Sequence, residues 1–218
     1  MRIKNIHKKL SLILFTGIAL LCVKCKTKNS RYLPIIGISK LDSVSKDTIY
    51  HTIANFSMMD QMGQIVTRDT FKHSIYVANF FFVTCPGICK KMNNELERVQ
   101  KTFAGYNSVK FISFTVNPEE DSIPVLAEYA KQHEAVPYQW YFLRGNKDTV
   151  LNLARHSYLA ETDGYLVHSQ NLTLIDMEGR IRGVYSGIIP AEIDRLIKDI
   201  NLLLKEESEN GNKIKMQR

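Results

Sequence analysis

The chain has 218 residues, 44% hydrophobic and 23% charged, which suits one packed domain and a short extension without disulfide support. The formal net charge is +7, but much of the excess lies at the two ends. No basic stripe is interleaved with aromatic residues, so the charge does not indicate nucleic-acid binding.

The first 25 residues are predicted to be a signal or membrane-anchor segment. A basic leader without acids precedes an apolar run at residues 10–23, which is shorter than the about 20 residues of a spanning helix. Cys22 and Cys25 lie at its end, where a bacterial lipoprotein carries its lipidated cysteine, although the preceding residues are not the usual small ones. An uncleaved anchor helix is the alternative. Either way, we expect the domain outside the cytoplasm, on the periplasmic side of a membrane, where cysteine pairs are exposed to oxidation.

Residues 26–54 are polar and irregular, and we expect a tether that ends in an extended lead-in. Residues 55–67 then predict an N-terminal β-hairpin, with two short strands around a turn at Gly63. Residues 74–83 form an unbroken apolar run rich in β-branched and aromatic residues. Such a run indicates a strand that is buried on both faces.

The rest of the chain alternates helical and strand patterns. The predicted helix at residues 122–134 has Ser122 as N-cap and Pro124 in its first turn. In chain order we expect a helix at residues 86–103, a strand at 109–116, a helix at 122–134, a strand at 140–145, a helix at 147–159, a hairpin at 171–187 and a closing helix at 191–207. This order predicts an α/β fold with a central mixed sheet flanked by helices, over residues 55–207. Residues 208–218 are expected to be a frayed polar tail.

Cys85 and Cys89 lie at the turn between the first buried strand and the helix that follows it. The first amide groups of a helix lack internal partners, and with the helix dipole they favour a thiolate. Residues four apart share a helix face, so the two sulfur atoms can converge. A structural disulfide, a redox pair and a metal site all stay open at this point.

Histidines are the candidates for a third metal ligand. His168 stands just before the predicted hairpin at 171–187, and in a thioredoxin-like fold this loop runs beside the cysteine turn. On spacing alone, a lone histidine is more often structural than a ligand. Of the other five histidines, His7 lies in the leader and His51 in the lead-in. We expect His73 and His133 to be solvated and His156 to be partly buried in a helix.

Four segments together resemble the SCO/SenC family of copper-binding, thioredoxin-like proteins. The resemblance runs from about residue 56 to residue 204 and covers nearly all of the predicted domain. Its most diagnostic part is the cysteine motif paired with a His-Ser before a hairpin. The matching segments are TCPGIC, VNPEEDS, WYFLRG and HSQNLTLIDMEGRIRGVYSG, at residues 84–89, 116–122, 140–145 and 168–187.

The resemblance implies a copper site formed by Cys85, Cys89 and His168. Two soft thiolates and one imidazole suit Cu(I), with Cu(II) as a further state, whereas zinc normally takes a fourth ligand. It also implies a membrane-tethered copper chaperone that assists assembly of the binuclear copper centre of cytochrome c oxidase. The expected partners are the copper-bearing oxidase subunit and a copper donor protein or thiol reductase.

The alternative reading is a thiol-disulfide oxidoreductase in which Cys85 and Cys89 reduce cysteines of a target or act in redox sensing. A pure oxidoreductase has no need of His168, whereas a copper carrier does.

The sequence departs from the family pattern at three positions, none of which is a ligand. Lys90 replaces a proline, Asn117 replaces the aspartate of a "DPE" segment, and Val167 replaces an acid just before the histidine. Loss of that acid is expected to change how His168 is oriented or how copper is tuned and released. Asp163 is a candidate substitute.

Overall fold

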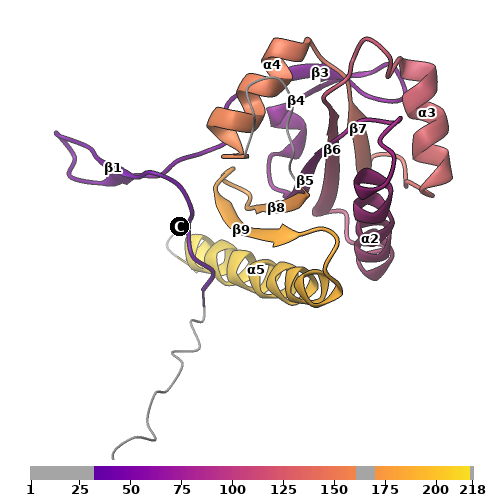
Figure 1. Cartoon of the computed structure of the whole chain (residues 1–218). Coiled ribbons are helices and arrows are strands. Elements are labelled where there is room, and N and C mark those ends of the chain that lie inside the picture. The colour runs from indigo at the N-terminus through magenta and orange to yellow at the C-terminus, as the bar shows by residue number, and fades with distance from the viewer. Residues whose placement is uncertain (1–31, 161–169, 217–218) are drawn as a thin grey trace, which may run out of the picture. The chain divides into compact units, whose positions relative to one another are not determined.

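The computed structural model describes residues 32–160 and 170–216, with side chains up to residue 209 (Figure 1). Residues from Tyr32 onward form one compact unit. The predicted leader, with Cys22, Cys25 and His7, lies outside the described residues, and so does His168.

A five-stranded mixed sheet forms the centre of this unit, in the order β7-β6-β5-β8-β9. The middle strand, β5 (Ile75–Phe81), pairs in parallel with β6 (Val109–Thr115) and antiparallel with β8 (Asn171–Ile175). The edges are β7 (Trp140–Leu143), parallel to β6, and β9 (Ile181–Ser186), antiparallel to β8. Every residue of β5 is buried, which confirms the prediction of a strand covered on both faces.

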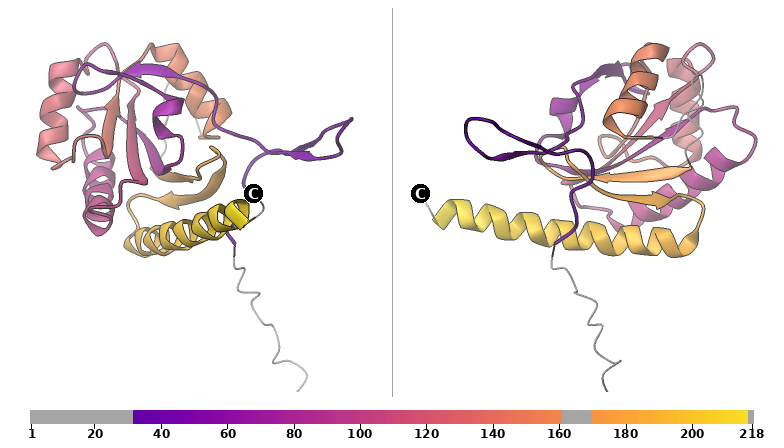
Figure 2. Two further views of the ribbon diagram at one scale, coloured as in Figure 1. Left: turned by 180° about the vertical axis from the view of Figure 1, so that it is seen from behind. Right: turned by 60° about the vertical axis from the view of Figure 1, so that its left-hand side comes forward.

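Helices lie on both faces of the sheet, as the views in Figures 1 and 2 show. The apolar cluster on one face combines sheet residues with α2 (Ile88–Thr102), α3 (Ile123–Gln132) and α5 (Pro190–Met216). The cluster on the other face includes residues of α4 (Lys147–Asn152) and of the π-helical turn η2 (Leu153–Ser157). The predicted α/β, thioredoxin-like class is therefore confirmed.

The predicted N-terminal hairpin consists of β3 (Ser57–Met59) and β4 (Ile65–Thr67), and the short helix η1 (Arg68–Phe71) follows it. Its turn protects the open edge of β7. The side-chain amide of Gln61 donates to the Trp140 carbonyl at 2.9 Å and accepts from the Phe142 amide at 2.9 Å. These bonds replace those of a further strand, so this edge is not free to pair with another chain.

The described part of the lead-in is attached to the domain at both ends. The buried guanidinium of Arg182 donates to the carbonyls of Leu33 and Pro34, at 2.7 and 3.1 Å. At the other end, Ile53 is fully buried and its amide donates to the Gly179 carbonyl at 2.8 Å. The short strands β1 (Lys40–Leu41) and β2 (Thr48–Ile49) lie between these two attachments.

The closing helix is longer than the sequence pattern indicated. We expected it to end near residue 207 and the chain to fray, but α5 continues to Met216. The apolar stripe ends earlier, and residues 208–212 (Ser-Glu-Asn-Gly-Asn) are mostly poor helix formers, so local propensity does not explain the extension, although no proline stops the helix after Pro190. Within the described ranges, none of the helices combines the length and apolar character needed to cross a bilayer.

Candidate metal and redox site

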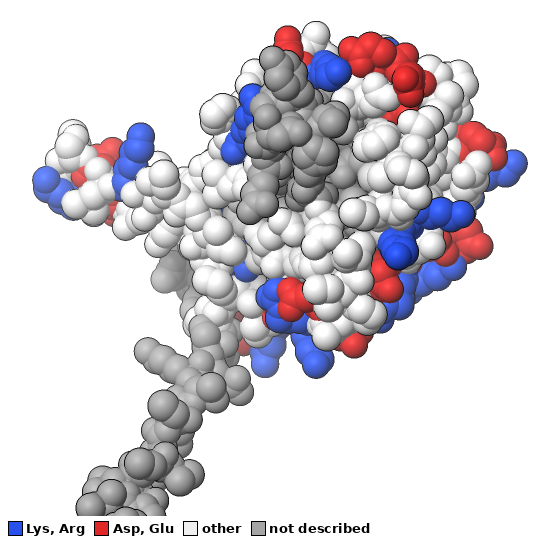
Figure 3. Space-filling model, in the orientation of Figure 1, with Lys and Arg blue, Asp and Glu red and all other residues white. Residues whose placement is uncertain are grey.

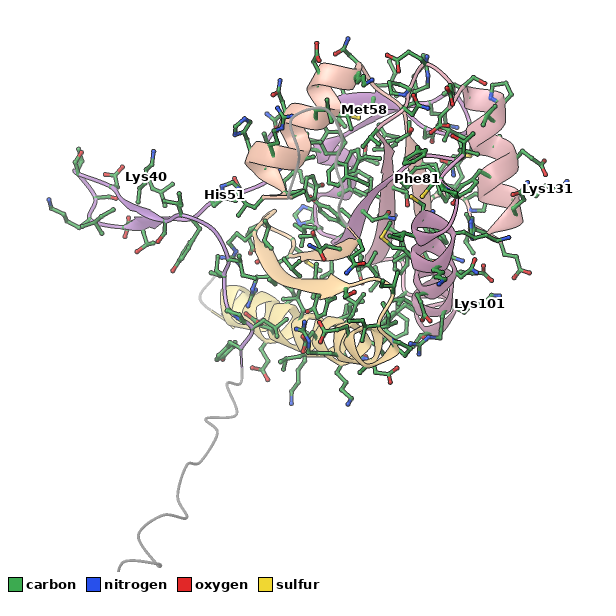
Figure 4. The ribbon with its side chains drawn as sticks, viewed as in Figure 1. Lys40, His51, Met58, Phe81, Lys101 and Lys131 are labelled. Atoms are coloured by element: carbon green, nitrogen blue, oxygen red, sulfur yellow. The ribbon has the colours of Figure 1, made fainter. Side chains whose placement is uncertain are left out.

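The two cysteines sit where β5 ends and α2 begins. Phe81 is the last residue of β5 and is labelled in Figure 4, and a short turn carries the chain from there to α2. The Cys85 amide donates to the Phe82 carbonyl at 3.2 Å, which closes this turn. Cys85 is half-buried, whereas Cys89, in the first turn of α2, is buried. One thiol is thus open to a partner, while the other faces the core.

The two thiols are free and interact directly. The Cys89 amide donates to the Cys85 sulfur at 3.4 Å. Burial raises the pKa of Cys85, but hydrogen bonds from the Cys89 thiol and from amides at the helix start outweigh it and bring that pKa below its usual value. Burial, and the hydrogen bond to Cys85, raise the pKa of Cys89 to about 12. Cys85 is therefore the more acidic thiol of the pair, as its position near unpaired amides predicts.

Asp121, in the loop that follows the neighbouring strand β6, fixes the cysteine turn. Its buried carboxylate accepts a hydrogen bond from the Thr115 hydroxyl and bonds from the Val83 amide at 3.2 and 3.3 Å. Burial raises the pKa of this carboxyl group above its usual value. The loop after β6 is thereby tied to the loop that carries Cys85. Sequence reasoning missed this role, although Asp121 lies in one of the four segments that carried the resemblance.

A chain of buried polar side chains connects α2 to the sheet and to α3. Trp140 Nε1 donates to Ser113 Oγ at 2.9 Å, and Ser113 Oγ donates to Asn79 Oδ1 at 2.6 Å. Asn79 Nδ2 donates to Asn93 Oδ1 at 2.8 Å, and Asn93 Nδ2 donates to the Tyr129 hydroxyl at 3.0 Å. Asn93 lies one helical turn after the second cysteine, so these bonds set how the start of α2 sits on the sheet. The sequence signal was an asparagine inside an apolar strand.

The chain after the predicted histidine ligand lies beside α2. His168, Val167 and Asp163 are outside the described residues, and the chain is described again from Gln170. The Gln170 carbonyl accepts from the Gly187 amide at 2.7 Å. A Cβ atom at Gly187 would lie 2.6 Å from Met92 Cγ on α2 and 3.0 Å from the Gln170 oxygen. Only glycine fits here without a shift, and its absent side chain lets β8, β9 and the first turns of α2 approach closely.

The other described histidines are structural or solvent-facing. His51 Nε2 is 2.8 Å from the Ser157 carbonyl, and His73 is exposed, as expected. The expectation of a partly buried His156 is wrong, because this side chain is exposed on η2. The expectation of a solvated His133 is wrong, because its side chain turns inward at the end of α3 and is only 4% exposed. It packs on the Tyr129 ring, with centroids 4.7 Å apart. Aromatic packing, not sequence polarity, decides its burial.

A separate acidic group lies at the turn between β8 and β9 and on α5. In the part of the chain that the structure describes, it is the one set of three metal-ligating side chains with ligand atoms within 4.8 Å, and it comprises Asp176, Glu178 and Glu207. The Arg180 guanidinium binds Asp176 and Glu178 at 2.7 and 2.8 Å. The arginine neutralises part of this charge, so the cluster is accounted for as an ion-pair network.

The fold and the cysteine pair together define a thioredoxin-like domain with a dithiol site at a helix start. The SCO1/SenC family model matches residues 45–205, and the chain belongs to this family. The SCO1 protein homolog of Bacillus subtilis is 26% identical over 162 residues, which are 71% of this chain and 84% of that protein.

Two solved structures are similar in fold and sequence. BsSco, a member of the Sco family of cytochrome c oxidase assembly proteins with a disulfide switch, has a TM-score of 0.62 and 26% identity, covering 70% of this chain and 93% of its own. Arabidopsis thaliana ScoI with copper bound has a TM-score of 0.56 and 26% identity, covering 68% of this chain and 97% of its own.

Proposed function

We propose that the protein is a copper chaperone that delivers Cu(I) to the binuclear copper centre of cytochrome c oxidase. The observation that carries this proposal is the pair of free cysteines at the start of α2, where the Cys89 amide donates to the Cys85 sulfur. Soft sulfur ligands select Cu(I), and family membership and the copper-bound relative support this metal. The expected partners are the copper-bearing oxidase subunit and a copper donor or thiol reductase.

The proposed ligands are the Cys85 and Cys89 sulfurs and an imidazole nitrogen of His168. Cys85 offers a thiolate readily because its pKa is lowered, whereas the pKa of Cys89 is about 12. Copper binding must therefore displace the Cys89 proton, and affinity should rise with pH. Two thiolates around Cu(I) leave one negative charge, which the amides at the start of α2 stabilise.

A second candidate function is reduction of a target disulfide. The half-buried, low-pKa Cys85 is suited to attack, and the buried Cys89 is suited to resolve. Cys85 thiolate would attack a target sulfur and release the other target thiol. Cys89 would then lose its proton and attack Cys85, which releases the second target thiol. The two electrons pass to the target, and a thiol reductase must restore the Cys85–Cys89 pair.

Tethering to the outer face of a membrane is part of the same proposal. The basic leader and the apolar run at residues 10–23 support it, with Cys22 or Cys25 lipidated or the helix uncleaved. Cell fractionation of a Cys22→Ser/Cys25→Ser double variant separates the two: loss of acyl label with release indicates a lipoprotein, and retention without label indicates a helix. Free protein in the wild type would contradict both.

Copper titration of the reduced protein tests the function. Competition against a Cu(I) chelator should give one tight site, which Cys85→Ser or Cys89→Ser abolishes and His168→Ala weakens. His156→Ala is the matched control, because His156 is exposed on η2. Disulfide reduction activity in all variants except the cysteine ones, together with an unchanged copper affinity in His168→Ala, would favour the oxidoreductase instead.

A further inference from the structure

The β1–β2 hairpin, residues 38–50, projects from the domain and carries exposed apolar side chains (Figures 1 and 2). Figure 4 places the labelled Lys40 on this projection, away from the body of the domain. Its surface combines apolar side chains with Ser, Thr, Lys and Asp. The exposed members, with their exposed fractions, are Ile38 (81%), Leu41 (67%), Val44 (89%), Ile49 (54%) and Tyr50 (42%).

Within the described residues, the hydrogen bonds of residues 40–49 all close inside the hairpin itself. The Asp42 amide donates to the Asp47 carbonyl at 2.8 Å, and the Asp42 carboxylate accepts from the amides of Val44 and Ser45 at 2.8 Å each. At the base, the Arg180 guanidinium lies 6.0 Å from the centre of the Tyr50 ring. An isolated two-stranded hairpin is marginal in water, and a cluster of exposed aliphatic residues marks a contact surface.

The distribution of these side chains favours a fluid apolar medium over a rigid partner. Leu41 opposes Thr48 and Lys40 opposes Ile49, so apolar residues occur on both faces of the hairpin as well as at its tip. A protein partner with one groove would cover only one face. Protein interfaces also rely on Trp, Tyr and Arg anchors, whereas Leu and Val are under-represented among them.

The chain upstream identifies that medium as a lipid bilayer. An apolar run at residues 10–23 follows a basic leader, and only residues 24–37 separate it from the hairpin. A linker of that length spans at most about 50 Å at full extension. Lys40 and Lys46 can extend their charged ends toward headgroups, while Asp42 and Asp47 oppose deep insertion. Figure 3 shows basic and acidic side chains among uncharged ones on this projection.

We propose that the β1–β2 hairpin inserts its tip into the headgroup region of a phospholipid bilayer and so orients the domain on the membrane. The proposal rests on the proposed tethering for its proximity to the bilayer, but not on copper binding. The attachments of Leu33, Pro34 and Ile53 to the domain would transmit the orientation.

A tryptophan scan of the full chain in vesicles tests this contact. The single native tryptophan, Trp140, is fully buried and supplies a constant background. Val44→Trp places a probe at the tip, and Val136→Trp, at an exposed position between α3 and β7, is the matched control. In vesicles of phosphatidylcholine and phosphatidylglycerol with brominated chains, the probe at 44 should be quenched at least about twofold more than the probe at 136.

Equal quenching of the two probes, with the protein held on the vesicles, would overturn the proposal while leaving tethering intact. A blue shift in the emission of the tryptophan at position 44 that appears without lipid as the protein concentration rises would also overturn the proposal, because a second copy would then cover the hairpin. If flotation shows that the chain does not stay on the vesicles, tethering fails. The hairpin contact then stands only if added excess vesicles still quench the probe at 44.

Discussion

At the scale of single residues, the two cysteines differ more than their shared motif suggests. Cys85 is the low-pKa thiol, and burial together with its bond to Cys85 raises the pKa of Cys89 to about 12. At neutral pH, iodoacetamide should therefore modify Cys85 first in the reduced protein. In Cys89→Ala, the pKa of Cys85 should rise, because the thiol that donates to it is removed. Mass spectrometry after pulsed alkylation across pH checks this, and equal labelling rates at both cysteines would contradict it.

His133 makes a second residue-scale prediction. Burial holds the pKa of this imidazole below its usual value of 6.5, with Glu97 at 3.8 Å acting in the opposite direction. Below about pH 6.5, the unfolded chain gains a proton that the folded protein resists, so stability should fall as pH falls. One proton accounts for at most about 1.4 kcal/mol per pH unit. His133→Gln should reduce this pH dependence in urea unfolding, and exposed His73→Gln should not; identical slopes would refute the assignment.

Sequence patterns located the cysteines but not the groups that surround them. A motif at the end of an apolar strand is a local signal, so Cys85 and Cys89 could be placed before the fold was known. The burial of His133 and the contact of Asp121 with the cysteine turn depend on packing between distant segments. A polar residue near a helix end looks solvated until its tertiary neighbours are known.

At the scale of elements, the buried polar chain should determine how firmly α2 sits on the sheet. Asn93→Ala removes a donor to the Tyr129 hydroxyl and an acceptor for Asn79, and leaves both groups unpaired in the core. This should cost about 2 kcal/mol of unfolding free energy. Asn94→Ala is the matched control, because Asn94 is the exposed neighbour on the same helix. Denaturant unfolding measures the stability of both variants, and a similar loss of unfolding free energy in each would contradict a role for the buried polar side chains.

The lead-in makes the other element-scale prediction. Arg182 binds Asp176 and Glu206 at 3.1 and 2.6 Å as well as the carbonyls of Leu33 and Pro34. Arg182→Met leaves the buried Glu206 carboxylate without its cationic partner and leaves Asp176 with Arg180 alone, which should cost about 3–5 kcal/mol. It should also release the lead-in to limited proteolysis. Exposed Arg195→Met should cost under about 1 kcal/mol. If the lead-in of Arg182→Met were as well protected from protease as that of the wild type, Arg182 would not hold this segment on the domain.

The elements themselves were largely predictable, and their ends were not. The buried strands, the N-terminal hairpin and the helix cap at Ser122 follow from local pattern and turn chemistry. The extension of α5 to Met216 has no amphipathic signal, because the residues that follow position 207 begin with Ser-Glu-Asn-Gly-Asn. The docking of residues 32–54 depends on Arg182, which no local pattern pairs with that segment.

At the scale of the whole molecule, copper and a disulfide compete for the same two sulfurs. The reduced apo protein should oxidise to an intramolecular Cys85–Cys89 disulfide, since the two side chains share a hydrogen bond and the Cys89 amide lies 3.4 Å from the Cys85 sulfur. A disulfide offers no thiolate, so the oxidised form should bind Cu(I) far more weakly, and bound Cu(I) should protect the pair from oxidation. Thiol labelling across a glutathione series, with and without copper, measures both effects. Full Cu(I) affinity in the oxidised form would place copper elsewhere.

X-ray absorption of the Cu(I)-loaded, reduced full-length protein tests the central claim most directly. Coordination by Cys85, Cys89 and His168 predicts two sulfur atoms and one nitrogen around copper in wild type, with loss of the nitrogen in His168→Ala. The His156→Ala control should keep the wild-type spectrum. A shell of sulfur alone that is the same in wild type and His168→Ala would contradict the proposed three-ligand copper site.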